Sequence, residues 1–125
     1  MTTTMSTYDR WRAGRRLLAA RRPLDAARVL EPAVADEPGA ASLHLLLARA
    51  YLASAQWRRA QGSFRRAVEI DPTDPYAHLA LARTLEHAGQ TDGARRHRNL
   101  ARALDPSYDA AELTSSAEPE GRERR

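Results

Sequence analysis

The amino-acid sequence predicts an all-α fold, an α-solenoid of three helix-turn-helix repeats wound into a right-handed superhelix. The first observation behind this prediction is that three prolines, Pro38, Pro72 and Pro106, recur at one constant interval. The second is that small residues keep the same interval, in the series Ala26, Ala60 and Ala94; Ala33, Ala67 and Ala101; and Gly14, Ala48 and Ala82. A fixed period of about 34 residues is typical of a helical repeat array, which leaves few positions for a unique catalytic constellation.

The second repeat shows the helical pattern most clearly. In residues 42–53 the apolar side chains recur at i, i+3, i+4, i+7 and i+8, the spacing of an amphipathic helix. A break follows at residues 54–56, and residues 57–70 predict a second helix with arginines on its outer side. Pro72 ends that helix, because a proline disfavours helical backbone in the residue before it. Each repeat is therefore expected to be a helical hairpin.

The third repeat carries its own start and stop signals. Asp74 is expected to cap a helix over 75–88 with Pro75 as its first residue, and Gly89 to end it in the left-handed conformation. A second helix is expected over 91–104. The first repeat predicts helices over 8–20 and 24–35, the latter kinked at Pro32.

These elements divide the chain into a repeat domain with short flanks. The small residues are expected at the helix crossings, where Gly or Ala permits the closest approach and a larger side chain would overpack. The expected segments are a disordered N-terminus (1–6), a three-repeat domain (7–106, in units of 7–40, 41–74 and 75–108), a short capping helix (107–114) and a disordered charged tail (115–125).

Composition narrows the classes of function. The 125 residues include no cysteine, which removes disulfides, thiolate zinc sites and cysteine nucleophiles. The net charge is +4, and all 20 basic residues other than histidine are arginine. No apolar run approaches the length of a membrane span, so the sequence predicts a cytoplasmic protein without a membrane anchor. No phosphate loop, nucleophile elbow or metalloprotease motif occurs, so neither an enzyme nor a cofactor is expected.

At this point the chain resembles the tetratricopeptide repeat (TPR) family, whose pattern runs W-x2-L-G-x2-Y, then A-x3-F, then P. The second repeat reads His44-x2-Leu47-Ala48-x2-Tyr51, Ala60-x3-Phe64, Pro72. The other repeats match in phase, as His78-x2-Leu81-Ala82-x2-Leu85, Ala94-x3-Arg98, Pro106, and as Arg10-x2-Ala13-Gly14-x2-Leu17, Ala26-x3-Leu30, Pro38. Arg10 and Arg98 replace large apolar residues at the two ends. This suits an array of three repeats, in which only the outer faces of the end units meet water.

The resemblance implies a concave groove lined by the first helix of each hairpin. The residues that it carries onto this groove are Tyr8, Trp11, Arg15, Leu45, Arg49, Leu52, Tyr76, Leu79, Arg83 and Glu86. They form a row of three arginines flanked by apolar residues, which suits a peptide or partner helix that mixes carboxylates with apolar anchors. The alternative is that arginine is this chain's generic polar helix former. The Lys and Asn set with which some TPR proteins hold a C-terminal carboxylate is absent.

Other interpretations remain beside this one. His44 and His78 recur at the repeat interval and could suggest a metal pair, but they occupy packing positions of the family pattern, so core packing is favoured and no metal is expected. His87 and His97 are interpreted as surface residues. Paired arginines could bind RNA or another anionic polymer, although interspersed acids and few aromatic residues disfavour nucleic acid. A structural self-assembly protein is a further alternative, and a monomer or weak self-association is expected.

Overall fold

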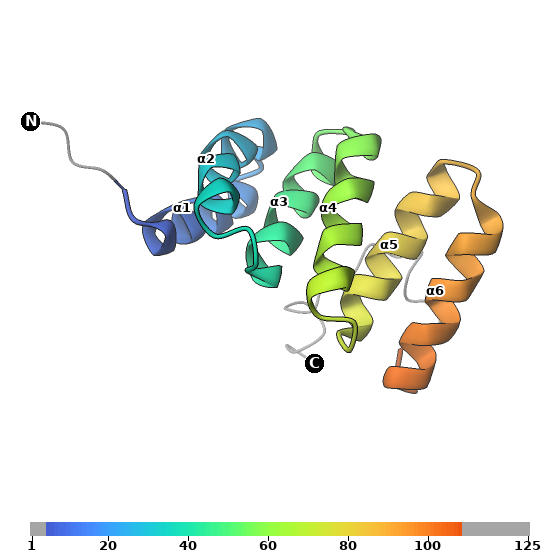
Figure 1. The fold of residues 1–125 in the computed structure, drawn as a ribbon. Helices are drawn as coiled ribbons and strands as arrows, with labels where there is room; N and C mark the ends of the chain where they lie inside the picture. The colour runs from blue at the N-terminus through green and yellow to red at the C-terminus, as the bar shows by residue number, and fades with distance from the viewer. Residues whose placement is uncertain (1–4, 109–125) are drawn as a thin grey trace, which may run out of the picture. The chain divides into compact units, whose positions relative to one another are not determined.

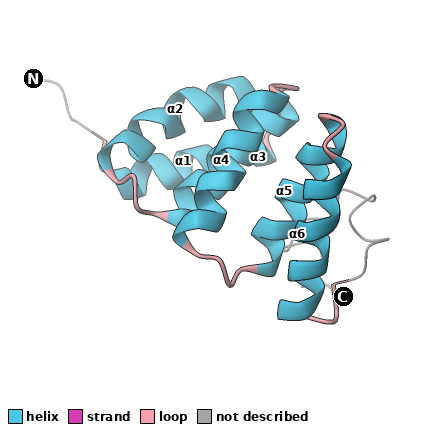
Figure 2. Ribbon diagram, turned by 45° about the vertical axis from the view of Figure 1, so that its right-hand side comes forward, coloured by secondary structure: helices cyan, strands magenta, loops and turns pink. Residues whose placement is uncertain are grey.

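The computed structural model describes residues 5–108, and this part of the chain contains six helices and no strand (Figures 1 and 2). The helices are α1 (Thr7–Ala19), α2 (Pro23–Asp36), α3 (Ala41–Ala53), α4 (Trp57–Ile70), α5 (Pro75–His87) and α6 (Thr91–Leu104). The predicted all-α repeat fold is confirmed, with helix ends within one residue of those expected. None of these helices has the length and apolar character needed to cross a membrane.

The chain divides into two compact units at the turn that carries the second repeat proline. The first unit, residues 1–70, holds the hairpins α1/α2 and α3/α4, and α3 packs against both α1 and α2. The second unit, residues 71–125, holds the hairpin α5/α6. The right-handed winding of the whole array stays a prediction. Ser107 lies in a turn and Tyr108 is not helical, so the expected capping helix does not begin at 107; residues 109–114 of that helix, like the charged tail, lie outside the described residues.

The helix starts follow the local signals in the sequence. The Asp74 side chain accepts a hydrogen bond of 3.0 Å from the backbone N–H of Tyr76, and Pro75 is the first helical residue, as predicted. Ser6 caps α1 in the same way, accepting a 3.0 Å hydrogen bond from the backbone N–H of Asp9. Such caps satisfy N–H groups that the first turn of a helix leaves without intrahelical partners.

The corner within each hairpin contains one residue in the left-handed backbone region. These residues are Arg21 (φ 62°), Ala55 (φ 60°) and Gly89 (φ 78°), and they recur at the interval of the repeat. The prediction for Gly89 is confirmed. The other two corners adopt the same conformation without glycine, at a cost of roughly 1–2 kcal/mol each. The left-handed backbone conformation is therefore the same at all three corners, although the residue type differs at each.

The small residues that recur with the repeat lie in the core. Ala26, Ala33, Ala48, Ala60, Ala82 and Ala101 are fully buried, and Ala67 and Ala94 nearly so. Gly14 makes the closest approach: a Cβ atom at this position would lie 2.6 Å from Cγ of Leu30. Because real Cβ contacts are never this short, α1 and α2 can pack at this separation only with glycine at position 14.

Candidate functional site

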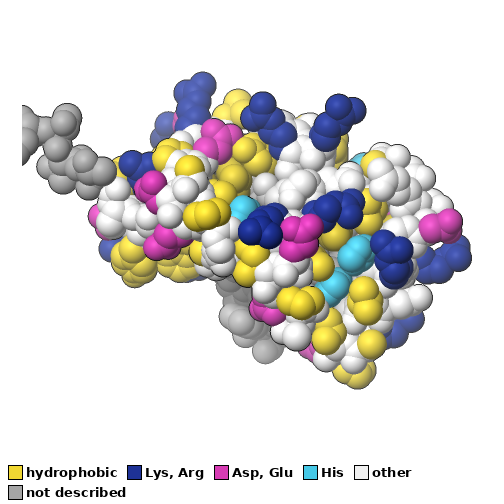
Figure 3. Space-filling view, viewed as in Figure 1, with side chains coloured by type: hydrophobic (Ala, Val, Ile, Leu, Met, Phe, Trp, Pro, Cys, Tyr) yellow, Lys and Arg dark blue, Asp and Glu magenta, His cyan; other side chains and the backbone are white. Residues whose placement is uncertain are grey.

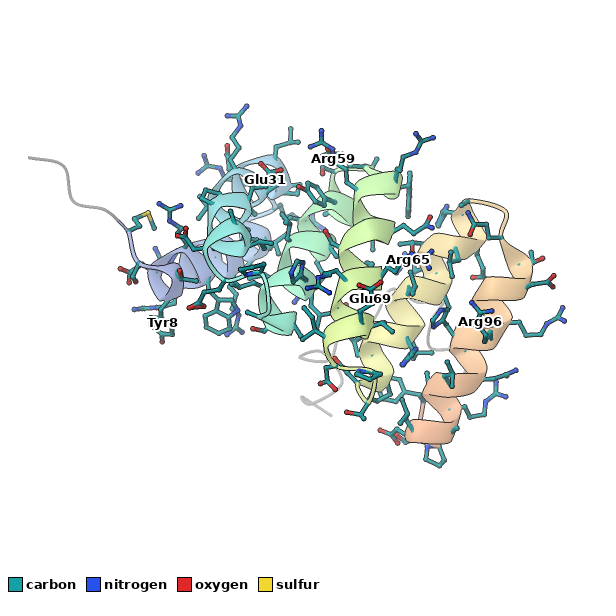
Figure 4. The ribbon with its side chains drawn as sticks, viewed as in Figure 1. Tyr8, Glu31, Arg59, Arg65, Glu69 and Arg96 are labelled. Atoms are coloured by element: carbon teal, nitrogen blue, oxygen red, sulfur yellow. The ribbon has the colours of Figure 1, made fainter. Side chains whose placement is uncertain are left out.

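The first helix of the chain supplies three of the predicted groove residues, Tyr8, Trp11 and Arg15. The side chain of Tyr8 is 63% exposed and points away from the neighbouring helices (Figure 4). Its ring stacks on that of Trp11, with the centroids 5.9 Å apart. The guanidinium carbon of Arg15 lies 5.0 Å from the centroid of the Trp11 ring, within the range of a cation–π contact. The three side chains therefore form one contiguous surface on α1.

Helix α3 supplies Leu45, Arg49 and Leu52. This helix is buried on most of its circumference, because it packs against α1, α2 and α4. Between Leu43 and Tyr51, only Leu45 and Arg49 are partly exposed, and Leu52 continues the same stripe one turn further on. The accessible stripe of α3 is therefore one arginine between two leucines, and it coincides with the predicted residues.

In the second unit, α5 carries Tyr76, Leu79, Arg83 and Glu86. Tyr76 and Arg83 are partly exposed, whereas Leu79 is only 5% exposed and is less accessible than an apolar anchor should be. Glu86 forms an ion pair with Arg98 of α6. The pair joins the two helices of the hairpin, so Arg98 contributes to the hairpin itself and does not simply face water.

The two histidines that recur with the repeat are hydrogen bonded to the repeat prolines. Nε2 of His44 lies 2.8 Å from the carbonyl oxygen of Pro38, and Nε2 of His78 lies 2.8 Å from that of Pro72. A carbonyl can only accept, so Nε2 carries the proton in both rings. Each histidine ties the first helix of its repeat to the turn that precedes it, which supports the packing interpretation. Within residues 5–108 no cluster of three or more potential ligands could hold a metal ion.

The expectation for His97 was wrong. Its side chain is 8% exposed, and its Nδ1 atom lies 2.9 Å from Nδ1 of His78, with the two rings stacked. Because Nε2 of His78 carries the proton, Nδ1 of a neutral His78 accepts from the N–H of His97. The sequence interpretation missed this pair because His97 does not recur: the corresponding residues of the other repeats are Val29 and Ser63.

A polar contact joins the first two hairpins within the first unit. The Tyr51 hydroxyl of α3 donates a 2.5 Å hydrogen bond to Glu31 of α2, and the guanidinium of Arg59, from α4, lies 3.8 Å from the same carboxylate oxygen (Figure 4). Burial, followed by the hydrogen bond to Glu31, raises the pKa of Tyr51 to about 12. Tyr51 is the tyrosine of the family pattern, so this contact connects the repeat motif to the packing between repeats.

The shifted phenol should be visible in an absorbance titration. The folded pKa of Tyr51 lies above its ordinary value of 10.0, so its stabilising contribution is complete below pH 10 and is lost as the pH rises towards 12. We expect a phenolate absorbance step near pH 12 that is absent from Tyr51→Phe and moves to lower pH in Glu31→Gln. Identical titration of all three proteins above pH 11 would contradict the contact.

Some members of the adjacent arginine pairs form ion pairs with nearby carboxylates. Arg22 pairs with Asp25 at 2.8 Å, and Arg66 pairs with Glu69 at 3.3 Å. Other arginines, including Arg65 and Arg96, extend into solvent (Figure 4). On the face drawn in Figure 3, the arginines lie apart from one another, with acidic and apolar side chains between them. Exposed ion pairs of this kind are typical of solvated helix faces and contribute little to stability.

The three helical hairpins and their recurring small core residues place this chain in the class of helical-repeat proteins built from antiparallel hairpins. Two family models described as tetratricopeptide repeat match the chain, over residues 17–62 and 63–96. The chain therefore belongs to the tetratricopeptide repeat family, whose repeats generally serve as non-catalytic protein-interaction modules. The comparison with curated proteins found no match.

Solved structures agree with this assignment. The chain is similar to "MamA 41-end from Desulfovibrio magneticus RS-1", with 27% identity over 82% of this chain and 58% of that chain and a TM-score of 0.76. It spans 58% of the length of a second MamA chain, the "MamA RS-1 ArsTM double mutant", also at 27% identity and with a TM-score of 0.77.

Two more distant structures show the same fold. The "CopN-Scc3 complex" matches at 14% identity over 90% of this chain and 69% of that chain, with a TM-score of 0.77. The "Second TPR of Spaghetti (RPAP3) bound to HSP90 peptide SRMEEVD" matches at 16% identity over 81% and 94%, also with a TM-score of 0.77.

Proposed function

We propose that this chain is a non-catalytic interaction scaffold that binds a peptide or partner helix along the first helices of its hairpins. The observation that carries the proposal is the accessible stripe of α3, where Arg49 lies between Leu45 and Leu52 on a helix whose other side chains from Leu43 to Tyr51 are buried. A guanidinium between two leucines suits a carboxylate flanked by apolar anchors. Trp11 and Arg15 of α1 offer the same combination, as do Tyr76 and Arg83 of α5.

The similar structures support a peptide or protein ligand. One is a complex of RPAP3 with an HSP90 peptide whose sequence, SRMEEVD, contains three acidic residues, and another is a complex of two proteins. The chain lacks the Lys and Asn set that would hold such a peptide by its C-terminal carboxylate. We therefore propose binding of an internal acidic and apolar segment, in which the arginine row contacts side-chain carboxylates.

A triple substitution tests this proposal. A partner captured from the source organism by the wild-type chain is first identified, and its dissociation constant is then measured by calorimetry. Replacing Arg15, Arg49 and Arg83 by Gln should weaken binding at least 10-fold, because hydrogen bonds to charged groups contribute about 1.5–3 kcal/mol each. The circular dichroism melting temperature should change little, since these side chains are not part of the apolar core.

The matched control removes the same charge from other faces. Arg58, Arg65 and Arg95 are exposed on α4 and α6, and replacing all three by Gln should weaken binding less than 3-fold. Added salt should weaken wild-type binding only in part, because screening leaves apolar burial intact. Equal losses in the two triple variants would refute the stripe and favour diffuse electrostatic attraction.

A further inference from the structure

Helix α1 carries an ordered ladder of two aromatic rings between two arginines. The ladder consists of Arg12, Tyr8, Trp11 and Arg15, at the i, i+3, i+4 and i+7 positions that share one face of a helix. The guanidinium of Arg12 lies 5.8 Å from the centroid of Tyr8, Tyr8 stacks on Trp11, and Arg15 lies 5.0 Å from the centroid of Trp11. Stacking on rings holds guanidinium groups in place before any ligand arrives.

The surface around the ladder is strongly positive. An open depression of about 390 Å³ is lined by Tyr8, Trp11, Arg12, Arg15 and Arg16, so among residues 5–108 its lining has three cations and no carboxylate. Asp9 is the one acidic residue of α1, against four arginines. The volume of the depression is typical of the smaller ligand sites in proteins, and it is large enough for one or two side chains of a partner.

The occupant that fits is an acidic peptide segment. Stacking on a ring uses the face of a guanidinium, whereas bidentate bonds to carboxylates are made by the N–H groups on its edge, so the two kinds of contact are compatible. Each ring already has one aromatic and one guanidinium neighbour, so neither offers two open faces to a stacking nucleic-acid base. The ladder therefore presents donors for carboxylates and ring edges for an apolar side chain.

We infer that the α1 ladder is the acidic-segment subsite of the proposed interaction surface, and that it binds two carboxylates on either side of an apolar side chain. This inference rests on the proposed function and adds residues to it. Arg12 and Arg16 are not members of the arginine row of Arg15, Arg49 and Arg83. Tyr8 has the new role of holding the guanidinium of Arg12 in place. The apolar side chain of the ligand would contact the exposed edge of Tyr8, and its carboxylates would bind the edges of Arg12, Arg15 and Arg16.

Fluorescence anisotropy with three labelled probes tests the subsite on the full chain. The probes are the peptide Glu-Glu-Leu-Glu-Asp-Leu, the same peptide with Gln and Asn in place of the acids, and a 12-nucleotide oligothymidine. We expect the acidic peptide to bind at least 10-fold more tightly than its amide counterpart and more tightly than the oligonucleotide. Equal binding of the two peptides would overturn the subsite, and tighter binding of the oligonucleotide would replace it with a nucleic-acid site.

Variants separate the ladder from general charge. Arg12→Gln/Arg16→Gln should weaken binding of the acidic peptide at least 10-fold, whereas the matched variant Arg58→Gln/Arg65→Gln on α4 should weaken it less than 2-fold. Tyr8→Ala leaves the charge unchanged but removes the ring that orders Arg12, and should weaken binding 3-fold or more. Wild-type affinity in Tyr8→Ala, or equal losses in the two double variants, would refute an ordered ladder. Melting curves confirm that each variant is folded.

A further variant distinguishes this inference from the proposed function. Arg49→Gln/Arg83→Gln changes the arginine row without touching the ladder. If only this variant loses binding of the captured partner, and the ladder variants bind that partner normally, the proposed function is supported and the inference about the ladder is refuted. If the ladder variants lose binding of both the partner and the acidic peptide, and Arg49→Gln/Arg83→Gln binds both normally, the inference about the ladder is supported and the role of the arginine row is refuted.

Discussion

Replacing His78 by Ala should lower the free energy of unfolding by about 3 kcal/mol. The side chain is 3% exposed, so its removal leaves a cavity, and large-to-small substitutions in cores cost roughly 2–5 kcal/mol. The substitution also removes two hydrogen bonds. The carbonyl oxygen of Pro72 loses its donor, which lay 2.8 Å away, and Nδ1 of His97 loses its acceptor, which lay 2.9 Å away. A buried polar group left without its partner costs about 1–3 kcal/mol, although these contributions overlap.

Urea unfolding followed by circular dichroism measures this loss, and the chain supplies graded controls. His44→Ala removes the equivalent bond to Pro38 but breaks no histidine pair, so it should cost less than His78→Ala. His87→Ala, at an exposed position, should change stability by less than about 0.5 kcal/mol. If His78→Ala were as mild as His87→Ala, the hydrogen bonds between His78, Pro72 and His97 would not be present in solution.

The second large effect should come from adding a single methyl group at Gly14. In Gly14→Ala the new Cβ would lie 2.6 Å from Cγ of Leu30, a side chain that is fully buried. Overpacking costs roughly 1–3 kcal/mol, and the better helix propensity of alanine returns about 1 kcal/mol. A net destabilisation of up to about 2 kcal/mol is expected.

Gly62 provides the matched control, because it also lies inside a helix but has open space where a Cβ would be added. Gly62→Ala should stabilise the chain by about 0.5–1 kcal/mol through helix propensity alone. The two variants should therefore shift the thermal midpoint in opposite directions, by about 4–8 °C for each kcal/mol. Stabilisation by both substitutions would show that α1 and α2 are not as close as Gly14 implies.

Local signals predicted most of the fold. The apolar period located the helices, and residues such as Asp74, Pro75 and Gly89 marked their ends, because caps and breakers act on the backbone within a few positions. The corners at Arg21 and Ala55 carry no such signal. Their left-handed backbone could have been inferred only by aligning them with Gly89 in the register of the repeat.

Contacts across long sequence separations were not predictable in the same way. Tyr51 and Glu31 are 20 residues apart, and His78 and His97 are 19 apart, so their pairing depends on how the helices pack. For the candidate site, the resemblance to the TPR family placed Leu45, Arg49 and Leu52 on one face of α3, and these three side chains are partly exposed. The resemblance failed to show that Leu79 is buried, because burial is determined by what covers a helix and not by its own pattern.

The shared backbone at the three hairpin corners has a consequence for how this chain could diverge or be engineered. Arginine, alanine and glycine all adopt the left-handed backbone conformation at this corner, so the corner does not require glycine. The residue at the corner of a hairpin can therefore change while the left-handed backbone conformation is retained. Grafting new specificity onto this chain should begin on the helices, with the corners left as fixed joints.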